Sequence, residues 1–551
     1  MIRIFCTNTG TSREFQEGAS LLEISEGFGF DEPFKILAAK VNNVAQGLRF
    51  RAYHNLNVEF VDYKAYIGRE FYCRSLCLLL HKAAGDIFPG STLTIKRPIS
   101  KGYFCDLVKA DGTPTEEKDA DAIRSRMEEL VALNMPIRRH ELQTDEAIRI
   151  FRKNGREDTA KLLETSGDVY TTCYSLDGTM DYYYDELVPS TGYLKVFGLI
   201  PYEHGLLLRV PDRHNPTELA PMFHQPKTFE VFKEASIWNS FMDLANVGDV
   251  NEQILSGNAS DLIRIAEALQ EKKIVRIAEE IEKRHSDREN PVQLVLITGP
   301  SSSGKSTFCK RLSTQLKACG LHPVSFSTDD YFVNRVDTPL LPDGSYDFDN
   351  FETVDYRCLQ SDLLKLLGGE EVDVPQYNFV TGEKEYHGKK KKLGERSVVL
   401  LEGIHALNPR LTDKVPEQKK YKIFINAITS ISLDSHNCIP TSDNRLLRRI
   451  VRDYLKGAFS VRESIANWPN VRRAEVKWIY PFQEEADVLF NSTYLVEFAA
   501  LRSKAERILS TVPKNCSEYT EAARLLKFLH CFLPVSDKDI PATSLIRSFI
   551  G

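Results

Sequence analysis

The chain has 551 residues, of which 42% are hydrophobic and 27% are charged. At roughly 150 residues per domain, this length predicts three to four domains. The composition is that of an ordinary globular protein, which excludes a disordered, collagen-like or coiled-coil chain. The formal net charge of −6 argues against a chain dominated by contacts to nucleic-acid phosphates, although one basic domain can hide in a neutral total.

Targeting and cysteine signals indicate a cytoplasmic protein. No stretch reaches the 18 or so apolar residues of a membrane helix, and the start, MIRIFCTNTG, lacks the basic and apolar parts of a signal peptide. The 11 cysteines are too sparse for a disulfide framework, and Cys73, Cys77 and Cys105 lack the paired spacing of a zinc site. We expect a soluble protein without membrane contact and with reduced, buried thiols.

Residues 1–65 alternate short apolar runs with turn signals, which predicts a small sheet with one helix. Gly18 precedes Leu21 and Leu22, and the run ILAAKVNN follows at Ile36–Asn43. These residues resemble the TGS domain at the front of threonyl-tRNA synthetases. The resemblance implies a small α+β domain.

Residues 66–250 resemble the second N-terminal domain of the same synthetases, a further α+β domain, with RSLCLLLHKAAGDIFPG as a helix and ISKGYFCDL as a strand. The resemblance implies two histidines, four residues apart on that helix, that hydrolyse mischarged tRNA. The matching positions here are Arg74 and Leu78. Because leucine can neither ligate a metal nor move a proton, we expect no editing chemistry. His81, the only histidine on that helix, is expected to pack or to lie on the surface, with catalysis as the alternative.

Residues 251–290 predict a helical connector. The apolar residues have a spacing near 3.6, which predicts one or two amphipathic helices that face a core, at Leu262, Ile265, Leu269, Ile277 and Ile281. The polar run KRHSDREN at 283–290 then breaks the pattern. We place the main domain boundary there.

A phosphate-binding loop begins the domain predicted at 291–500. Val292–Thr298 is a continuous apolar run, typical of a parallel strand covered on both faces. Gly299, four further residues, and then Gly304, Lys305 and Ser306 satisfy G-x-x-x-x-G-K-[ST]. An apolar residue every fourth position then predicts a helix, which Gly320 would end, at Phe308, Leu312 and Leu316.

This motif predicts a nucleoside triphosphate, because its backbone N–H groups curl around phosphates and side chains at the two glycines would obstruct them. The helix N-terminus adds partial positive charge. Lys305 can reach the β and γ phosphates, and Ser306 can ligate magnesium. The expected ATP-binding loop comprises Gly299, Pro300, Ser301, Ser302, Ser303, Gly304, Lys305, Ser306 and Thr307.

Acidic residues follow the next strand, Pro323 to Ser327. Ligands of open α/β sheets bind beyond the carboxyl ends of the strands, so either Asp329 or Asp330 could accept a proton from an attacking hydroxyl. The alternative for each is a cap or turn. The lysine run at 389–392 is most simply a solvated loop, with phosphate contact as the alternative.

An arginine face occurs in DNRLLRRIVRDYLKG, because Arg445, Arg448, Arg449 and Arg452 stand at i, i+3, i+4 and i+7. Like charges packed together repel, which favours a polyanionic phosphate as their partner. The alternative is a solvated helix that binds scattered carboxylates.

These blocks together resemble the uridine kinase and phosphoribulokinase family over 291–497, most closely its uridine/cytidine kinases. The ordered matches are GPSSSGKST, STDDYF, YDFDNF, VPQYNF, VVLLEGI and RLLRRIVRD. The resemblance implies a P-loop fold, a parallel sheet with helices on both faces. It implies Asp329 as the catalytic base, with Lys305, Arg445 and Arg448 also catalytic. It further implies that Glu402 and Ser306 bind Mg²⁺, that Arg452 binds ATP, and that the substrate is bound by Asp349, Tyr377, Tyr331 and Phe379.

The function that this resemblance implies is ATP-dependent phosphorylation of the 5′-hydroxyl of a ribonucleoside, uridine or cytidine first. Uridine kinases read the pyrimidine with a histidine where this chain has Gly382, and Asn378 also departs from their pattern, which bears on selectivity. One alternative is a kinase of another small hydroxyl compound, as in the phosphoribulokinase branch. Another is an RNA- or ribosome-associated regulator that uses ATP as a switch.

The last segment, 501–551, is predicted to be helical and to pack on the kinase domain through Leu525, Leu526 and Leu529. For the whole chain we expect ATP, Mg²⁺ and a nucleoside as ligands. RNA or a regulatory ligand is a further candidate at the N-terminal domains. We also expect a homo-oligomer.

Overall fold

The computed structural model describes residues 1–30, 34–342 and 344–551. Its first α+β unit contains a five-stranded sheet in the order β2-β1-β7-β4-β5. One helix, α1 (Leu21–Gly27), covers it. The capping box of Ser20 and Glu23 fixes where that helix begins. The strands are β1 (Ile2–Cys6), β2 (Thr11–Phe15), β4 (Ala38–Val41), β5 (Val44–Gln46) and β7 (Leu56–Val61), beside the short pair β3 (Ala19–Ser20) and β6 (Arg51–Ala52).

The second α+β unit is built around α2 (Tyr66–Ile87), a helix that is buried on most of its faces because apolar residues surround it. A four-stranded sheet, β13-β14-β9-β8, and a three-stranded sheet, β10-β11-β12, complete the unit. Its elements are β8 (Thr92–Ile99), β9 (Gly102–Val108), α3 (Glu117–Ala132), β10 (Arg138–Gln143), α4 (Thr144–Lys153), α5 (Glu157–Glu164), β11 (Tyr170–Leu176), β12 (Thr179–Tyr182), β13 (Gly198–Tyr202) and β14 (Gly205–Arg209).

Three helices join this half to residues 291–500, called the kinase half after the resemblance above: α6 (Pro226–Phe241), α7 (Val247–Leu255) and α8 (Ala259–His285). The predicted stripe belongs to the single helix α8, where Leu262, Ile277 and Ile281 are buried. Ile265 was placed wrongly, since it is 41% exposed. The buried face runs through Ala266 and Ile274 instead.

The kinase half contains a fully parallel five-stranded sheet in the order β16-β21-β15-β22-β23. Side chains of the central strand β15 (Leu294–Thr298) alternate between two cores: Leu294 and Leu296 pack with α10 (Tyr356–Leu367), and Val295 and Ile297 pack with α8 and α9 (Lys305–Ala318). The predicted sheet with helices on both faces is therefore confirmed. The other strands are β16 (His322–Ser327), β21 (Ser397–Glu402), β22 (Lys420–Asn426) and β23 (Val488–Asn491).

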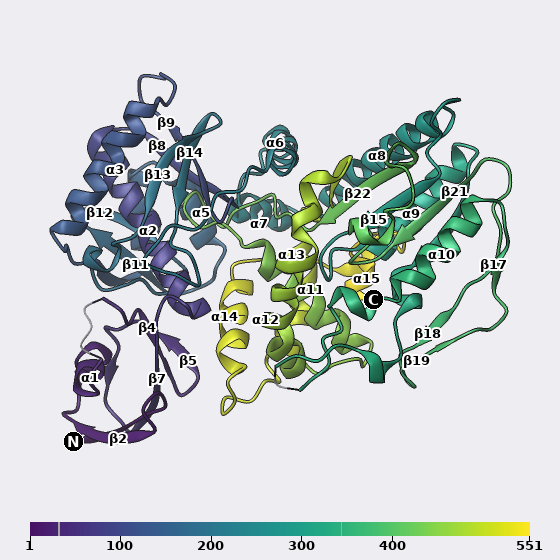
Figure 1. Ribbon diagram of the computed structural model, residues 1–551. Helices are drawn as coiled ribbons and strands as arrows, with labels where there is room; N and C mark the ends of the chain where they lie inside the picture. The colour runs from purple at the N-terminus through teal and green to yellow at the C-terminus, as the bar shows by residue number, and fades with distance from the viewer. Residues whose placement is uncertain (31–33, 343) are drawn as a thin grey trace.

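Further helices and hairpins surround this sheet. The helices α11 (Thr441–Leu455) and α12 (Val461–Trp478) follow β22. Two short strand pairs form an arm at the edge of the kinase half (Figure 1): β17 (Val372–Asp373) with β20 (Lys390–Lys391), and β18 (Gln376–Asn378) with β19 (Glu383–Glu385). In the lysine run, Lys390 pairs with Glu371, and Lys391 lies over the Phe326 ring.

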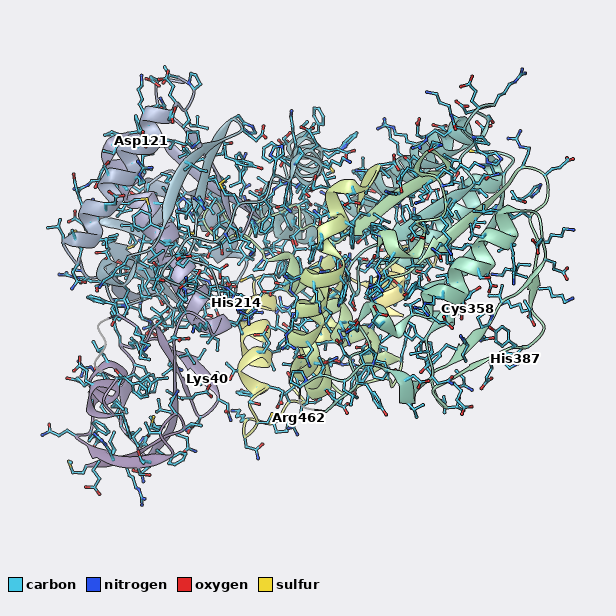
Figure 2. The ribbon with its side chains drawn as sticks, in the orientation of Figure 1. Lys40, Asp121, His214, Cys358, His387 and Arg462 are labelled. Atoms are coloured by element: carbon cyan, nitrogen blue, oxygen red, sulfur yellow. The ribbon has the colours of Figure 1, made fainter. Side chains whose placement is uncertain are left out.

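The C-terminal helices α13 (Glu497–Leu509), α14 (Tyr519–Leu529) and α15 (Arg547–Ile550) contact both halves of the chain (Figure 1). Leu525 and Leu529 are fully buried. The segment also packs on the first α+β unit, because Thr520 Oγ1 donates a hydrogen bond to the carbonyl oxygen of Asn43 at 2.8 Å. Arg462, labelled in Figure 2, pairs with Glu518 just before α14.

Within the described part of the chain, we find no helix that combines the length and the apolar character needed to cross a membrane. The eleven cysteines are all free thiols, and most of them are buried.

Candidate phosphate-transfer site

The phosphate loop connects β15 to α9 and requires glycine at two positions. A Cβ atom on Gly299 would lie 2.0 Å from the carbonyl oxygen of Ile425, a clash with backbone that cannot move aside. Gly304 precedes α9 with φ of 90°, in the left-handed region that glycine adopts without strain. The N-terminus of α9 therefore points its N–H groups into the loop.

Lys305, the first residue of α9, folds back over the loop. Its Nζ donates to the carbonyls of Gly299 (2.9 Å) and Pro300 (3.1 Å). Burial lowers the pKa of Lys305, and the nearby carboxylates of Glu402 and Asp329 oppose that shift. The ammonium thus lies between the loop and these two acids, where a phosphate bound in the loop would meet it.

Ser306 and Glu402 meet across two neighbouring elements. The Ser306 hydroxyl donates to both carboxylate oxygens of Glu402 at 3.1 Å. Glu402 ends β21, and the strand register pairs it with Ile297 of β15 and Ser327 of β16. Burial and the Asp329 charge raise its pKa. A hydroxyl and a carboxylate are oxygen ligands of the kind that Mg²⁺ prefers, so these residues fit the ion.

Asp329 follows β16 and is exposed to solvent, with Thr328 Oγ1 donating to its carboxylate at 3.4 Å. Although the side chain reaches solvent, the protein around it still raises the pKa of Asp329 by desolvation. Lys305 opposes that rise, and the charge of Asp330 adds to it. Asp330 is half-buried and interacts with Lys389 and Lys391 instead. The two candidate bases therefore face different cations, and Asp329 is the one beside the phosphate loop.

The arginine face of α11 meets carboxylates and the loop itself, which corrects the predicted phosphate partner for Arg445 and Arg448. Both side chains are buried, with Arg445 0% and Arg448 1% exposed. Arg445 pairs with Glu475 and donates to Ser301 O at 3.1 Å. All five N–H groups of Arg448 have partners, which are Glu497, Ser492 and the carbonyl of Ser302.

Glu475 and Glu497, which the sequence analysis missed, hold this arrangement together. Glu475 Oε1 accepts the N–H of Ser301 at 3.1 Å, so the Arg445–Glu475 pair binds both backbone groups of one loop residue. Burial alone would raise the pKa of Glu475, but Arg445 and Arg472 outweigh it and hold the pKa low. No local sequence signal distinguishes a buried glutamate from a surface one on α12.

Two arginines of the same face remain closer to solvent. Arg449 Nη1 donates to Ser301 Oγ at 3.0 Å. Arg452 bonds Asp453 and, together with Ser306 and Thr307, lines a cavity of about 910 Å³. Residues 542–544 and 547–549 of the C-terminal segment line the same cavity, which no sequence motif indicated.

Asp349, which is predicted to bind the acceptor, lies close to the buried His405. Burial raises the pKa of Asp349 to about 6, while Arg449 and Lys305 oppose the rise, so this carboxyl lies near both. His405 is 1% exposed, and its ring lies against the backbone of Asp349 and Asn350. Burial lowers its pKa to about 4, so the ring is neutral. The motif VVLLEGI stops just short of this histidine.

Aromatic rings gather where the sequence predicts a base. The Tyr377 ring lies edge-on to Phe332 (5.5 Å) and to Phe379 (5.1 Å), and Phe379 is 62% exposed. Tyr331 does not join them. It is fully buried and donates its hydroxyl to Asp362 at 3.0 Å, so its predicted contact with substrate is wrong.

Gly382 and Asn378 shape the turn between β18 and β19. Gly382 has φ of 78°, and Asn378 Oδ1 accepts two N–H groups of the turn. A Cβ on Gly382 would lie 2.8 Å from the Arg335 side chain. A guanidinium therefore stands where a larger side chain at 382 would project.

In the N-terminal half, Arg74 and Leu78 have structural surroundings. Arg74 stacks over Tyr184, with its guanidinium carbon 4.7 Å from the ring centroid, and pairs with Glu70 and Asp185. Leu78 is fully buried. Neither offers a group for hydrolysis.

A strand, a phosphate loop and a helix, with carboxylates at the ends of the flanking strands, define a P-loop phosphotransferase of the kinase class. The family model "Phosphoribulokinase / Uridine kinase family" matches residues 294–498. The uridine kinase of Mycoplasma genitalium is 31% identical over 178 residues, which are 32% of this chain and 74% of that kinase. The chain belongs to the phosphoribulokinase / uridine kinase family.

The N-terminal half is similar to a different protein. A threonine–tRNA ligase from Laribacter hongkongensis is 30% identical over 194 residues, which are 35% of this chain and 30% of the ligase. A solved structure described as a possible uridine kinase from Bacillus stearothermophilus has a TM-score of 0.26 and 15% identity, covering 40% of this chain and 98% of that one. The chain thus joins a domain of this kinase family to a region similar to part of a threonine–tRNA ligase.

Proposed function

We propose that the protein transfers the γ-phosphoryl group of ATP to the 5′-hydroxyl of a ribonucleoside, a pyrimidine one first. The observation that carries the proposal is the position of two acids beside the phosphate loop: Asp329 lies two residues after the end of β16, and Glu402 is the last residue of β21. One acid is exposed to an incoming hydroxyl, and the other is bonded to the loop serine.

In the reaction, the acceptor oxygen forms a bond to the γ-phosphorus as the bond from that phosphorus to the bridging oxygen of ADP breaks. The proton of the hydroxyl passes to the carboxylate of Asp329, and the products are a nucleoside monophosphate and ADP. Its raised pKa makes Asp329 a better proton acceptor than an ordinary surface aspartate.

The chain supplies positioning and charge, since the transition state of phosphoryl transfer is loose and asks little covalent work of the protein. Lys305 neutralises charge on the β and γ phosphates. Arg445 and Arg448 act as positioning residues, because their N–H groups hold the carbonyls of Ser301 and Ser302. Ser306 and Glu402 would hold Mg²⁺, which supplies further charge neutralisation when bound.

The acceptor is bound by the aromatic and acidic groups on the other side of the site. The exposed Phe379 ring, held edge-on by Tyr377, offers a flat apolar surface for a base. Asp349 in its ionised form would accept hydrogen bonds from the ribose hydroxyls.

An acceptor screen with the purified full-length chain tests the proposal, with ADP release followed for uridine, cytidine, the purine nucleosides and sugar phosphates. We expect ribonucleosides to stimulate release, and Asp329→Asn to reduce turnover by about 10²- to 10⁴-fold. Asp330→Asn is the matched control, since that neighbour faces lysines instead of the loop. Near-normal turnover of Asp329→Asn would remove the base assignment.

A phosphorylated sugar is the second candidate acceptor, and the Arg335 side chain beside Gly382 favours it. A guanidinium binds phosphate in a bidentate manner. Stimulation by sugar phosphates alone, lost in Arg335→Ala, would replace the nucleoside with this acceptor and leave the phosphate-loop chemistry intact.

A further inference from the structure

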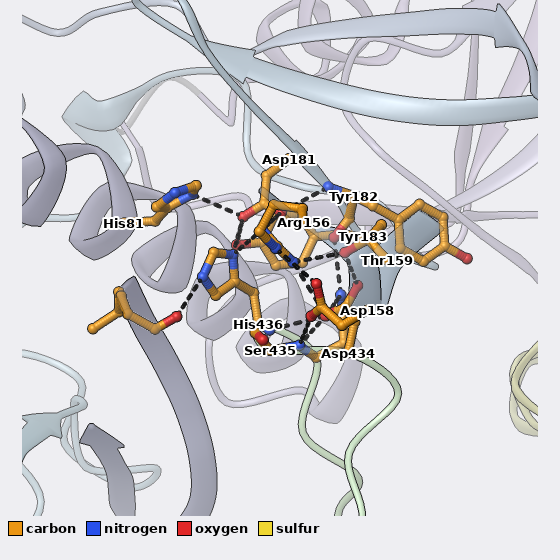
Figure 3. A network of polar contacts seen from close by, with 12 residues as sticks. His81, Arg156, Asp158, Thr159, Asp181, Tyr182, Tyr183, Asp434, Ser435 and His436 are labelled. Atoms are coloured by element: carbon orange, nitrogen blue, oxygen red, sulfur yellow. Dashed lines mark hydrogen bonds and ion pairs between the residues drawn. The ribbon is translucent and has the colours of Figure 1, made fainter. Parts of the chain in front are cut away.

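A second cluster of chemically active side chains lies far in sequence from the phosphate loop, where the two halves of the chain meet (Figure 3). It comprises His81 of α2, Asp181 of β12, and His436 of the segment between β22 and α11. The donor atoms of the three residues lie within 4.8 Å of one another. Two ligands thus come from the half that resembles the tRNA ligase, and one comes from the kinase half.

The two imidazoles converge on a single carboxylate oxygen. His436 Nδ1 lies 2.6 Å and His81 Nδ1 lies 3.1 Å from Asp181 Oδ2. The ring centroids of the histidines are 4.2 Å apart. Figure 3 shows both rings directed at Asp181 from different elements.

The tautomer of His436 is fixed from behind. Its Nε2 lies 3.0 Å from the carbonyl oxygen of Leu93. A carbonyl only accepts, so Nε2 carries the hydrogen, and in the neutral ring the lone pair is on Nδ1, which accepts from Arg156 Nη1 at 2.7 Å and lies beside Asp181 Oδ2. Histidines that bind metals are oriented in the same way, by donating the other N–H to a backbone carbonyl.

Asp181 is oriented as well, because its two oxygens have different partners. Oδ1 accepts from Arg156 Nη1 at 2.8 Å and from its neighbour's backbone, Tyr182 N–H, at 2.9 Å. Oδ2 faces the two histidines and the Tyr183 hydroxyl at 3.2 Å. The carboxylate is therefore held by one oxygen and offers the other to the histidine side.

Arg156 lies beside the cluster, among three carboxyl groups. Arg156 ion-pairs with Asp158, Asp181 and Asp434 at 3.3, 2.8 and 3.7 Å. The oxygens of Asp434 accept two backbone N–H groups, a side-chain amide and a hydroxyl, and these bonds fix the loop that carries His436.

We propose that His81, Asp181 and His436 bind a divalent transition metal, with Zn²⁺ as the expected occupant. Two imidazole nitrogens and one carboxylate oxygen form a donor set that suits Zn²⁺ and leaves a fourth position for water. Water can reach that position from the side of His81, whose side chain is 24% exposed. Arg156 Nη1, now 2.7 Å from His436 Nδ1, gives up that contact on binding and keeps its three carboxylates.

Such a site would tie the ligase-like half to the kinase half, because neither half contains all three ligands. The metal adds a bond between segments that are 255 residues or more apart in the sequence, as Asp181 and His436 are. A metal that binds the folded chain but not the unfolded chain stabilises the folded state by mass action.

The test uses the full-length chain, dialysed against a chelator and titrated with Zn²⁺ in a calorimeter. We expect one equivalent to bind, and His81→Ala to weaken the affinity by at least about 100-fold, since even second-shell changes cost 10- to 100-fold. His81 is the variant of choice, because it is partly exposed and its removal leaves the Arg156 network in place. His214→Ala is the matched control, a surface histidine of the same half (Figure 2).

Co²⁺ in place of Zn²⁺ supplies a second readout. We expect visible absorption bands of a tetrahedral nitrogen and oxygen site, which His81→Ala abolishes while far-ultraviolet circular dichroism stays unchanged. Equal Zn²⁺ affinity in the unaltered chain and in His81→Ala would show that the metal binds elsewhere and would overturn the proposal. Sulfur-to-cobalt charge-transfer bands would assign the metal to cysteines and would also overturn it. Absence of Zn²⁺ binding at micromolar concentrations would also overturn it.

Discussion

Glu475 gives the sharpest test of how the phosphate loop is held. Glu475→Gln keeps the shape of the side chain but removes its charge and turns one oxygen into an amide N–H₂ group that faces a guanidinium. Arg445, fully buried, then has no counter-charge. Removing one partner of a buried ion pair costs about 3–5 kcal/mol. A domain of roughly 200 residues loses about 2–4 °C per kcal/mol, so we expect Tm to fall by roughly 6–20 °C.

The assay pairs thermal unfolding with ATP binding by the purified chain. ATP affinity should fall by about tenfold or more, since the weakened Arg445–Glu475 pair is what holds both backbone groups of Ser301 in the loop. Glu463→Gln is the control on the same helix, because glutamine also serves in the capping box with Ser460. The double variant Arg445→Met/Glu475→Met should recover stability without recovering ATP affinity. A Tm of Glu475→Gln within about 2 °C of the unaltered protein would refute the reasoning.

Three further predictions concern the acceptor side, the core and the metal. Burial raises the pKa of Asp349 to about 6, and binding of the acceptor requires its ionised carboxylate, so kcat/KM for the acceptor should fall about tenfold per pH unit below 6. Asp349→Asn should remove that pH dependence, and an unchanged pH profile in this variant would contradict the assignment. Tyr331→Phe should cost about 1–3 kcal/mol in urea unfolding, since buried Asp362 loses its donor, yet leave KM for the acceptor unchanged; a raised KM would restore Tyr331 to the substrate site. Glu402→Gln should raise the Mg²⁺ concentration for half-maximal rate by about 10- to 100-fold, and an unchanged Mg²⁺ dependence would count against this residue.

The phosphate loop and its sheet could be predicted because their signals are local. A continuous apolar run, two glycines at fixed spacing and a four-residue apolar repeat each report the physics of a single element. Glu402 follows by the same reasoning, since a carboxylate at the end of a parallel strand lies at the ligand-binding edge. The structure brings it to the loop serine at 3.1 Å.

The partners of the arginine face could not be predicted, for a physical reason. A spacing of i, i+3, i+4 and i+7 tells which side chains stand together on α11, but the group opposite them comes from another element. Glu475 and Glu497 lie 30 and 49 residues further along the chain from Arg445 and Arg448, respectively. Tyr331 escaped for a similar reason, because a tyrosine after a strand packs inward or outward according to tertiary contacts.

Burial of these two arginines changes which cations can meet a phosphate. Arg448 has no N–H group left over, and Arg445 uses both of its terminal nitrogens on Glu475, Ser301 and Tyr480, so neither can turn to ATP without breaking a buried ion pair. That break would cost several kcal/mol, more than a single new phosphate contact typically returns. We therefore expect Lys305 and the arginines nearer to solvent to neutralise the transferred phosphoryl group. Arg452, which is 26% exposed and lines the cavity beside Ser306, is the member of the face best able to move toward a bound nucleotide.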